Sequence, residues 1–374
     1  MKRSLFFICT FLLCYSSVTN AQIDLTFDDI EDSAIEQKTS SDETKDTSGS
    51  FFSGFGKAFN FLGSTEDEKA IKKEPIIDID ELKNKASKGD IQAQLDLGYM
   101  FLYGKDGANI DYKQAIHYYE LAARNKNPIA LNNMGSLYFN GIGTEVNYEK
   151  AIKYFEIAAK YGSNDAAINL AIIYLGADIK NKNDEIWSKI YSLLQQAEKS
   201  NSNAKFLLGY SYYKGFLVEK DYKKAFELIK QASADGYDEA LYILSKFYLN
   251  GLGTTRNYNN AVKYLTFSAE QGYVDAMVDL ADIYADGKIY KKDTEKAYIL
   301  YNIASVMGSD DAAQKRDNIE KMLKIDELLA VQATAENFEV KPTNQTIFVR
   351  KTFGNSLKAY IDMNIKNANG IVIE

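Results

Sequence analysis

Cysteine is nearly absent from the sequence, and its position excludes disulfide bonds from the mature chain that we expect. Both cysteines, Cys9 and Cys14, lie within residues 1–21. This segment has a basic start, a short apolar run and small residues up to Ala21, which is the pattern of a secretory signal peptide. We predict cleavage after Ala21, with an uncleaved anchor as the alternative. An exported chain without cysteine must be stabilised by packing.

Residue types that carry chemistry are equally scarce. His117 is the single histidine, and the mature chain has no cysteine that would share a metal ion with it, which argues against a zinc site. The sequence has no G-x-S-x-G motif for a nucleophilic serine. We therefore predict that the protein is not an enzyme and has no catalytic residues, no metal and no cofactor.

The chain also lacks a basic cluster and, after its first segment, a long apolar run. Without Lys2 and Arg3 the mature chain has 42 basic and 52 acidic residues, a net charge of −10. Residues 22–50 alone contribute −7, from nine acidic residues and two lysines. Phosphate binding needs a basic face, so nucleic acid is not an expected partner. No later segment has the length of a membrane helix.

What the sequence does have is repetition. An alanine recurs every 36 to 38 residues, and an apolar residue follows it after four residues, a small one after five and an aromatic after eight. Offsets of 0, 4 and 8 lie on one helix face, and a small residue beside that face lets a second helix approach closely. The recurring alanines are Ala93, Ala130, Ala166, Ala204, Ala240, Ala276 and Ala312.

Each unit continues with the signals of a second helix. A glycine that fits a left-handed helix C-cap comes first, and an Asp or Asn that fits an N-cap follows it. The glycines are Gly104, Gly141, Gly176, Gly215, Gly251 and Gly287, and the N-cap residues are Asp111, Asn147, Asp184, Asp221, Asn257 and Asp293. Two helices with a short connection form an αα-hairpin, so we predict six stacked hairpins over residues 93–311.

These residues resemble the Sel1-like repeat family, which is related to tetratricopeptide repeats. Residues 130–162, "ALNNMGSLYFNGIGTEVNYEKAIKYFEIAAKYG", match the family pattern nearly throughout. The third unit departs most, because it lacks the G-x-G and has two extra residues. The resemblance implies an all-α fold, a right-handed α-solenoid of six repeats, and it implies protein–protein scaffolding and not catalysis.

Two of the units contain a glycine pair, Gly141 with Gly143 and Gly251 with Gly253. A phosphate-binding loop would need a preceding strand and further glycines, whereas a helix is expected before both pairs. We interpret the pairs as turns.

Both ends of the repeat array have signals of capping helices. Residues 76–92 look like a lone second helix that would cover the first repeat, and residues 312–338 have a helical apolar pattern that would close the last one. Solenoids need such caps because the terminal apolar faces would otherwise be exposed to water.

In the tetratricopeptide relatives, one face of the first helix of each unit lines a groove. We expect aromatic residues there to anchor an interface, and Asn132, Asn133 and Asn169 to hydrogen-bond the backbone of an extended peptide. Packing between repeats and solvated helix surface are the alternatives. The predicted partner-binding residues are Tyr99, Asn132, Ser136, Phe139, Phe206, Tyr210, Tyr213, Tyr242 and Lys246.

Residues 22–75 form an acidic leader that we expect to be mostly disordered. An aromatic, glycine-rich stretch at residues 49–64 interrupts it, and we predict that this stretch docks on a membrane interface or a partner. Packing on the first repeat helices is the alternative. The docking residues are Phe51, Phe52, Phe55, Phe59, Phe61 and Leu62.

The last stretch, residues 339–374, is rich in β-branched residues and phenylalanine after Pro342, so we predict two or three short strands. They would extend a partner's sheet or lie along the solenoid.

The sequence thus predicts a non-enzymatic scaffold that binds a partner protein or peptide. We expect it in the periplasm, at the outer envelope or secreted, in envelope assembly or host interaction and virulence. One alternative is a structural organiser of the envelope with peripheral membrane association through residues 51–62. A less favoured alternative is a hydrolase acting on amide or carbohydrate substrates.

Overall fold

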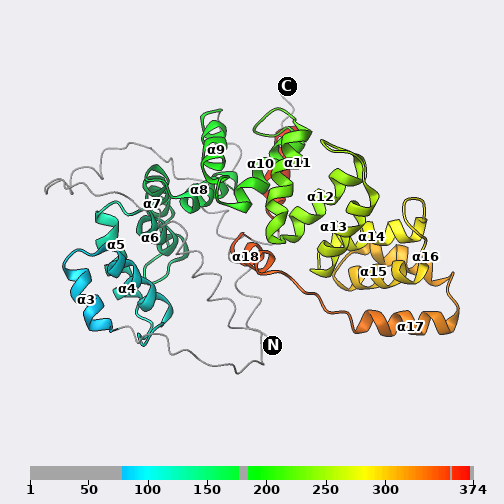
Figure 1. The fold of residues 1–374 in the computed structure, drawn as a ribbon, viewed down its shortest axis with the longest axis horizontal. Coiled ribbons are helices and arrows are strands. Elements are labelled where there is room, and N and C mark those ends of the chain that lie inside the picture. Colours follow the sequence, from blue (N-terminus) through cyan, green and yellow to red (C-terminus); the bar gives the residue numbers. More distant parts are fainter. Residues whose placement is uncertain (1–77, 177–183, 354–355, 371–374) are drawn as a thin grey trace. The chain divides into compact units, whose positions relative to one another are not determined.

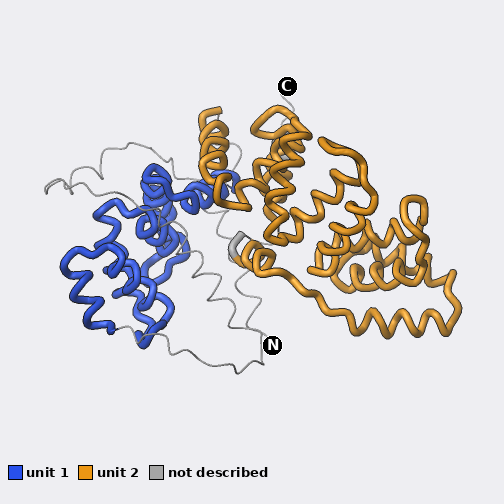
Figure 2. The backbone as a smooth tube through the Cα atoms, viewed as in Figure 1, with its two compact units in different colours: residues 1–178 blue, residues 179–374 orange. Residues whose placement is uncertain are grey.

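The fold is helical throughout the part of the chain that the structure describes. A computed structural model describes residues 78–176, 184–353 and 356–370, which form 17 α-helices and one 3₁₀ helix (Figure 1). The chain divides into two compact units, residues 1–178 and residues 179–374 (Figure 2). The all-α prediction is confirmed. None of the described helices is long and apolar enough to cross a membrane.

Unit 1 begins with a lone helix and continues as hairpins. The lone helix packs on the first helix of the first hairpin, and its Ala86 is buried there. This confirms a helical cap within residues 76–92. The helices are α3 (Ile79–Ser87), α4 (Ile91–Tyr103), α5 (Tyr112–Arg124), α6 (Pro128–Asn140), α7 (Tyr148–Lys160) and α8 (Asn164–Gly176).

Unit 2 starts with the second helix of the third repeat and contains three complete hairpins. Their helices are α9 (Asp184–Ala197), α10 (Ser202–Lys214), α11 (Tyr222–Ala232), η4 (Ser233–Asp235), α12 (Asp238–Asn250), α13 (Tyr258–Glu270), α14 (Val274–Asp286) and α15 (Thr294–Val306). Four more helices follow: α16 (Asp310–Glu320), α17 (Ile325–Glu336), α18 (Asn344–Phe353) and α19 (Lys358–Gly370). α16 and α17 pack on α15, so the closing helices predicted within residues 312–338 are present.

The repeated capping residues act as the sequence predicts. The Asp111 carboxylate accepts hydrogen bonds from the backbone N–H groups of Lys113 and Gln114 at the start of α5. At the C-terminal end of α4, Gly104 is the C-cap residue and has a left-handed backbone conformation, with φ of 62°. Gly141, Gly215, Gly251 and Gly287 end their helices in the same way. In the third repeat, Gly176 is the last residue of α8 and Asp184 the first residue of α9, and the residues between them lie outside the described part.

Small residues bring the two helices of a hairpin together. A Cβ atom on Gly135 of α6 would lie 2.7 Å from the Phe155 ring of α7, and one on Gly98 would lie 2.5 Å from the Tyr119 ring. Tyr119 and Phe155 are themselves buried. Glycine at this position therefore makes room for one aromatic ring, and the ring fills the space between the helices.

The second glycine of each G-x-G pair brings neighbouring repeats together. Gly143 and Gly253 have φ of 70° and 64°. A Cβ atom on Gly143 would lie 2.4 Å from Cβ of Tyr112, and one on Gly253 would lie 2.0 Å from the Tyr222 carbonyl oxygen. Tyr112 and Tyr222 open the second helix of the preceding repeat. The prediction of a turn is confirmed.

The prediction of strands for residues 339–374 is wrong. Residues 344–353 and 358–370 are the helices α18 and α19. The β-branched residues that favoured a strand include Thr346 and Val349, which are three positions apart, lie on one helix face and are fully buried. Their tertiary contacts outweigh a weak local preference. Residues 371–374 lie outside the described part.

Candidate protein-binding groove

The C-terminal segment, residues 339–353 and 356–370, lies on the first-helix face of repeats four and five. After α17 the chain runs back along unit 2, and α18 lies close to α10 and α12 (Figure 1). We call the surface of the repeats that contacts this segment the groove face. It consists of Asn203 and Tyr210 of α10, Asp238, Glu239 and Tyr242 of α12, and Gln271, Tyr273 and Asp275 around the start of α14.

Glu239 forms the centre of this face by capping the start of α19. Its Oε2 atom accepts hydrogen bonds from the backbone N–H groups of Leu357 and Lys358, at 2.9 and 3.1 Å, and from the Tyr237 hydroxyl at 2.6 Å. Its Oε1 atom accepts from the Ser356 hydroxyl. The carboxylate therefore takes the place of a helix N-cap from outside the helix.

The environment of Glu239 changes its acidity. The residue is fully buried, and burial raises the pKa of its carboxyl group, against the opposing effect of the hydrogen bonds from Ser356 and Tyr237. A buried carboxylate with several donors is costly to leave without them. The segment and Glu239 therefore depend on each other.

Asp238 provides an ionic contact beside this cap. Its carboxylate pairs with the Arg350 guanidinium of α18, and Asp238 itself is only 2 % exposed. Arg350 also donates to the Gln271 carbonyl oxygen at 3.2 Å. Burial raises the pKa of Asp238, whereas the charge of Arg350 acts in the opposite direction. Pairing of this kind is what permits a carboxylate to be buried.

Gln271 accepts hydrogen bonds from two threonine hydroxyls at the start of the segment. Its Oε1 atom accepts from the hydroxyls of Thr343 and Thr346, at 3.1 and 2.6 Å, and its Nε2 atom donates to the Gly236 carbonyl oxygen at 2.8 Å. Thr346 in turn accepts from the Asp238 backbone N–H at 3.0 Å. The Gln271 oxygen also accepts from the Thr343 backbone N–H, so this contact needs hydrogen-bond donors at positions 343 and 346.

Aromatic residues complete the groove face. The Lys358 ammonium lies 5.6 and 5.8 Å from the ring centroids of Tyr242 and Tyr273, and 3.4 Å from the Asp275 carboxylate. Such a position combines cation–π and ionic attraction. On α10, the Tyr210 hydroxyl donates to the Asp362 carboxylate at 2.9 Å.

The predicted partner-binding residues of unit 2 divide into three kinds. Tyr210 and Tyr242 lie on the groove face and contact the C-terminal segment. Tyr213 and Lys246 are half-buried: Tyr213 packs against Phe247, and Lys246 pairs with Asp279. Phe206 requires a correction. It is fully buried, and its ring packs against those of Tyr210 and Tyr237. Phe206 therefore belongs to the core beneath the groove face and is not an exposed anchor.

In unit 1, the predicted residues come from neighbouring first helices. Asn169 of α8 donates to the Asn132 side-chain oxygen of α6 at 3.1 Å, and the Ser136 hydroxyl donates to the Asn132 carbonyl. The rings of Tyr99 and Tyr103 are 4.9 Å apart, and those of Phe139 and Tyr148 are 5.2 Å apart. Their role in partner binding stays a prediction. The docking residues Phe51 to Leu62 lie outside the described residues.

Sequence reasoning missed Asp238, Gln271, Thr346, Arg350 and Ser356. An acidic pair at a helix start, such as Asp238 and Glu239, is ordinary helix chemistry and does not indicate a binding site. The threonine and arginine at positions 346 and 350 are four residues apart, a helical spacing that would have been the available signal.

His117 has no site around it. It lies exposed on α5, and its ring meets the Tyr118 ring edge-on at 5.2 Å. Within the described residues, no three His, Cys, Asp or Glu side chains gather in a way that would hold a metal ion.

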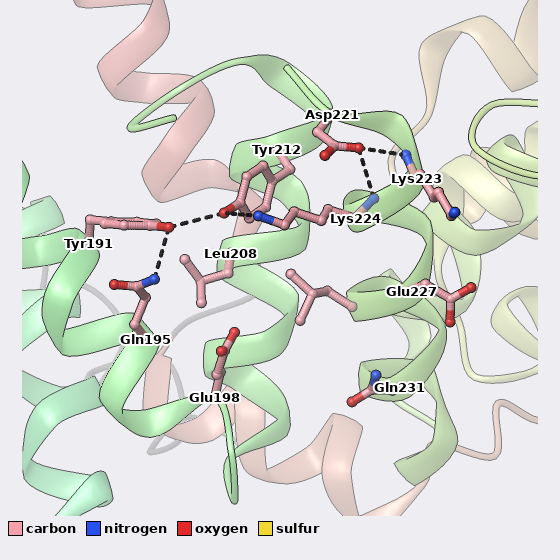
Figure 3. Close-up of a pocket in the computed structure, with 11 residues that line it drawn as sticks. Tyr191, Gln195, Glu198, Leu208, Tyr212, Asp221, Lys223, Lys224, Glu227 and Gln231 are labelled. Atoms are coloured by element: carbon pink, nitrogen blue, oxygen red, sulfur yellow. Dashed lines mark hydrogen bonds between the residues drawn. The ribbon is translucent and has the colours of Figure 1, made fainter. Parts of the chain in front are cut away.

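A shallow pocket of about 400 Å³ lies between α9, α10 and α11 (Figure 3). The hydroxyls of Tyr191 and Tyr212 are 3.0 Å apart, and Gln195 donates to Tyr191 at 2.9 Å. The hydrogen bond with Tyr212, aided by burial, raises the pKa of Tyr191 to about 12. This chain of hydrogen bonds joins α9, from the atypical third repeat, to α10.

Comparison with known proteins agrees with the helical architecture. A family model described as Sel1 repeat matches residues 91–127, 128–163, 202–237, 238–273 and 274–309. The five matches leave out residues 164–201, the third unit, which departs most from the pattern. No curated protein matches the chain.

Two bacterial proteins are among the solved structures similar to the chain. One is a protective antigen present in uropathogenic Escherichia coli strains and described as displaying an SLR fold, at 25 % identity and a TM-score of 0.61. The match covers 73 % of this chain but only 58 % of the antigen. Another is a Sel1 repeat protein from Oxalobacter formigenes, 25 % identical, matched over 62 % of this chain and 100 % of its own, with a TM-score of 0.48.

Proposed function

The chain belongs to the Sel1 repeat family, and from this premise we propose that it is a non-enzymatic scaffold that binds a partner protein or peptide. The binding site in this proposal is the groove face of unit 2. The partner presents a short helical segment there, in the place where the C-terminal segment lies.

One observation carries this proposal: the groove face already holds a peptide segment through specific side-chain contacts. Glu239, Asp238 and Gln271 each bind a different feature of the segment, namely backbone N–H groups, a guanidinium group and hydroxyl groups. Docking of a helical segment into a groove of helices is a recurring mode of peptide recognition. A surface that holds one segment in this way has the chemistry to hold another.

The same contacts support binding as opposed to catalysis. The two buried carboxylates, Asp238 and Glu239, accept hydrogen bonds from groups that do not titrate near neutral pH, including backbone N–H groups and a guanidinium group. A carboxylate engaged in this way positions a segment and does not transfer protons to a substrate.

We further propose that the protein acts after export, in the periplasm, at the outer envelope or as a secreted protein. The signal-peptide pattern of residues 1–21 supports this location, although those residues lie outside the described part. The likeness to a protective antigen of uropathogenic strains supports a role in host interaction. Mass spectrometry of the chain from its own cells should find a form that begins at Gln22. A chain that still contains residues 1–21 would contradict export by cleavage.

Photo-crosslinking tests the binding site. A photoreactive amino acid placed at Lys246, on the first helix of repeat five, should form a covalent adduct with the partner in living cells. The matched control is the same amino acid at Phe267, which is 44 % exposed on the second helix α13. An adduct from position 267 and none from position 246 would place the partner on the other face and contradict the proposal.

A further inference from the structure

The contacts of the C-terminal segment define what the groove face recognises. On the groove side, three acidic residues take part: Asp238, Glu239 and Asp275. On the segment side, Arg350 and Lys358 bring the complementary positive charges. Lys214 and Asp362 form one contact of the opposite polarity, at 3.7 Å. The main charge pattern is an acidic groove that receives a basic segment.

The start of α19 adds a structural requirement. Glu239 binds the N–H groups of Leu357, which directly precedes α19, and of Lys358, its first residue; N–H groups at a helix start have no partner within the helix. The residue before them, Ser356, binds the same carboxylate through its hydroxyl and also accepts from the Ala359 N–H at 3.2 Å. Leu357 and Ile361, four positions apart, are fully buried. A helix that starts with a hydroxyl residue and an apolar residue fits this site.

The segment is joined to the rest of unit 2 in a manner that permits exchange. Residues 338–343 connect α17 to α18 without helix. The segment also contributes apolar side chains to the buried interior, namely Val349, Leu357 and Ile361. Exchange would therefore require the incoming segment to bury apolar side chains in their place, whereas the polar groups left behind, such as Asp238, Glu239 and Gln271, would be hydrated in the interval.

We propose that the groove face is selective for a basic helical segment with a hydroxyl residue two positions before its first helical residue, and that the C-terminal segment holds the site in competition with such a segment of a partner protein. This inference rests on the proposed function and specifies the partner's chemistry. The attached segment has an effective concentration in the millimolar range, so a partner in solution binds only weakly until the segment is displaced.

Binding of a peptide added in solution tests the competition. The probe is a fluorescein-labelled synthetic peptide of residues 341–365, titrated against the full chain and followed by fluorescence anisotropy. Arg350→Ala in the chain weakens its own segment and leaves the groove face intact, so the probe should bind at least about tenfold more tightly than to the unchanged chain. Adding Glu239→Ala to that variant should abolish the gain.

A second variant tests the same expectation in case Arg350→Ala does not fold. Ser356→Ala combined with Lys358→Ala also weakens only the attached segment, and it should increase probe binding in the same direction. Circular dichroism shows which variants keep their helices. If the probe binds no variant that stays folded, the segment is a fixed part of unit 2 and the inference is overturned.

The outcomes separate this inference from the proposed function. Probe binding that depends on Glu239 supports the recognition rule even if no partner is crosslinked at position 246. A crosslinked partner whose adduct is unaffected by Arg350→Ala and by Glu239→Ala leaves the scaffold function in place and overturns the recognition rule.

Discussion

Gly253→Ala is expected to lower the free energy of unfolding of the protein by about 3–5 kcal/mol. The reason is a collision between repeats. The added Cβ atom would lie 2.0 Å from the Tyr222 carbonyl oxygen and 2.4 Å from its carbonyl carbon, and backbone atoms cannot rotate away as a side chain does. The φ of 64° adds the strain of a left-handed conformation. Chemical denaturation followed by circular dichroism measures the change.

Gly308→Ala is the matched control for this substitution. Gly308 also lies in unit 2 and has a φ of 100°, but a Cβ atom there would meet nothing within 4 Å. It isolates the backbone strain, for which we expect about 1–2 kcal/mol. Equal losses at the two positions would show that contact between repeats at Gly253 does not contribute.

Glu239→Ala is expected to release the C-terminal segment from the groove face. The substitution removes the acceptor of the Leu357 and Lys358 N–H groups and of the Ser356 hydroxyl, and each donor left buried would cost about 1–3 kcal/mol. Detachment avoids that cost because water then binds the donors. Limited trypsin digestion followed by mass spectrometry should show rapid cleavage after Arg350 and Lys358 in the variant and slow cleavage in the unchanged chain.

Glu239→Gln should keep the segment in place. One amide oxygen replaces the acceptor, and the amide N–H groups donate to hydroxyl oxygens that accept as readily as they donate. Trypsin resistance equal in Glu239→Ala and in Glu239→Gln would contradict the role of the acceptor.

The same argument gives a pH dependence. Burial raises the pKa of Glu239 above its value in the unfolded chain, so the folded protein binds this proton at a higher pH. The contribution of Glu239 to the free energy of unfolding is therefore smallest above its folded pKa and grows as the pH falls through it. Chemical denaturation followed by circular dichroism at several pH values is accordingly expected to show no loss of stability from Glu239 as the pH falls into the mildly acidic range.

The repeat architecture was predictable because its signals are local and recur. Each N-cap, such as Asp111, and each C-cap, such as Gly104, acts within its own helix end, and six near-copies of the pattern reduce the chance of error. The third repeat shows the limit of this method. Where the G-x-G is lost, the family model finds no match over residues 164–201.

The C-terminal helices were not predictable from local preference. Thr346 and Val349 favour strands in isolation, and what places them in a helix is burial against residues more than 100 positions earlier, such as Asp238. The periodicity of a single sequence does not predict which distant surface of the fold a segment will pack against.

The candidate site was predictable in position but not in chemistry. Projection of the groove positions identified Tyr210 and Tyr242, and both contact a peptide segment in the structure. The projection did not show that this segment belongs to the same chain, or that Asp238 and Gln271 also bind it through hydrogen bonds. Contact of these residues with a partner protein stays a prediction.

The measurement that tests the central claim most directly is partner capture with the C-terminal segment locked in place. Asn203 and Gln345 are joined by a 2.8 Å hydrogen bond, and the expected mature chain has no cysteine, so Asn203→Cys with Gln345→Cys gives one reactive pair for a short bismaleimide. Asn203→Cys alone, treated with the same reagent, is the control. The account predicts that the control captures the partner and the locked chain does not. Equal capture by both would contradict the groove face as the binding site.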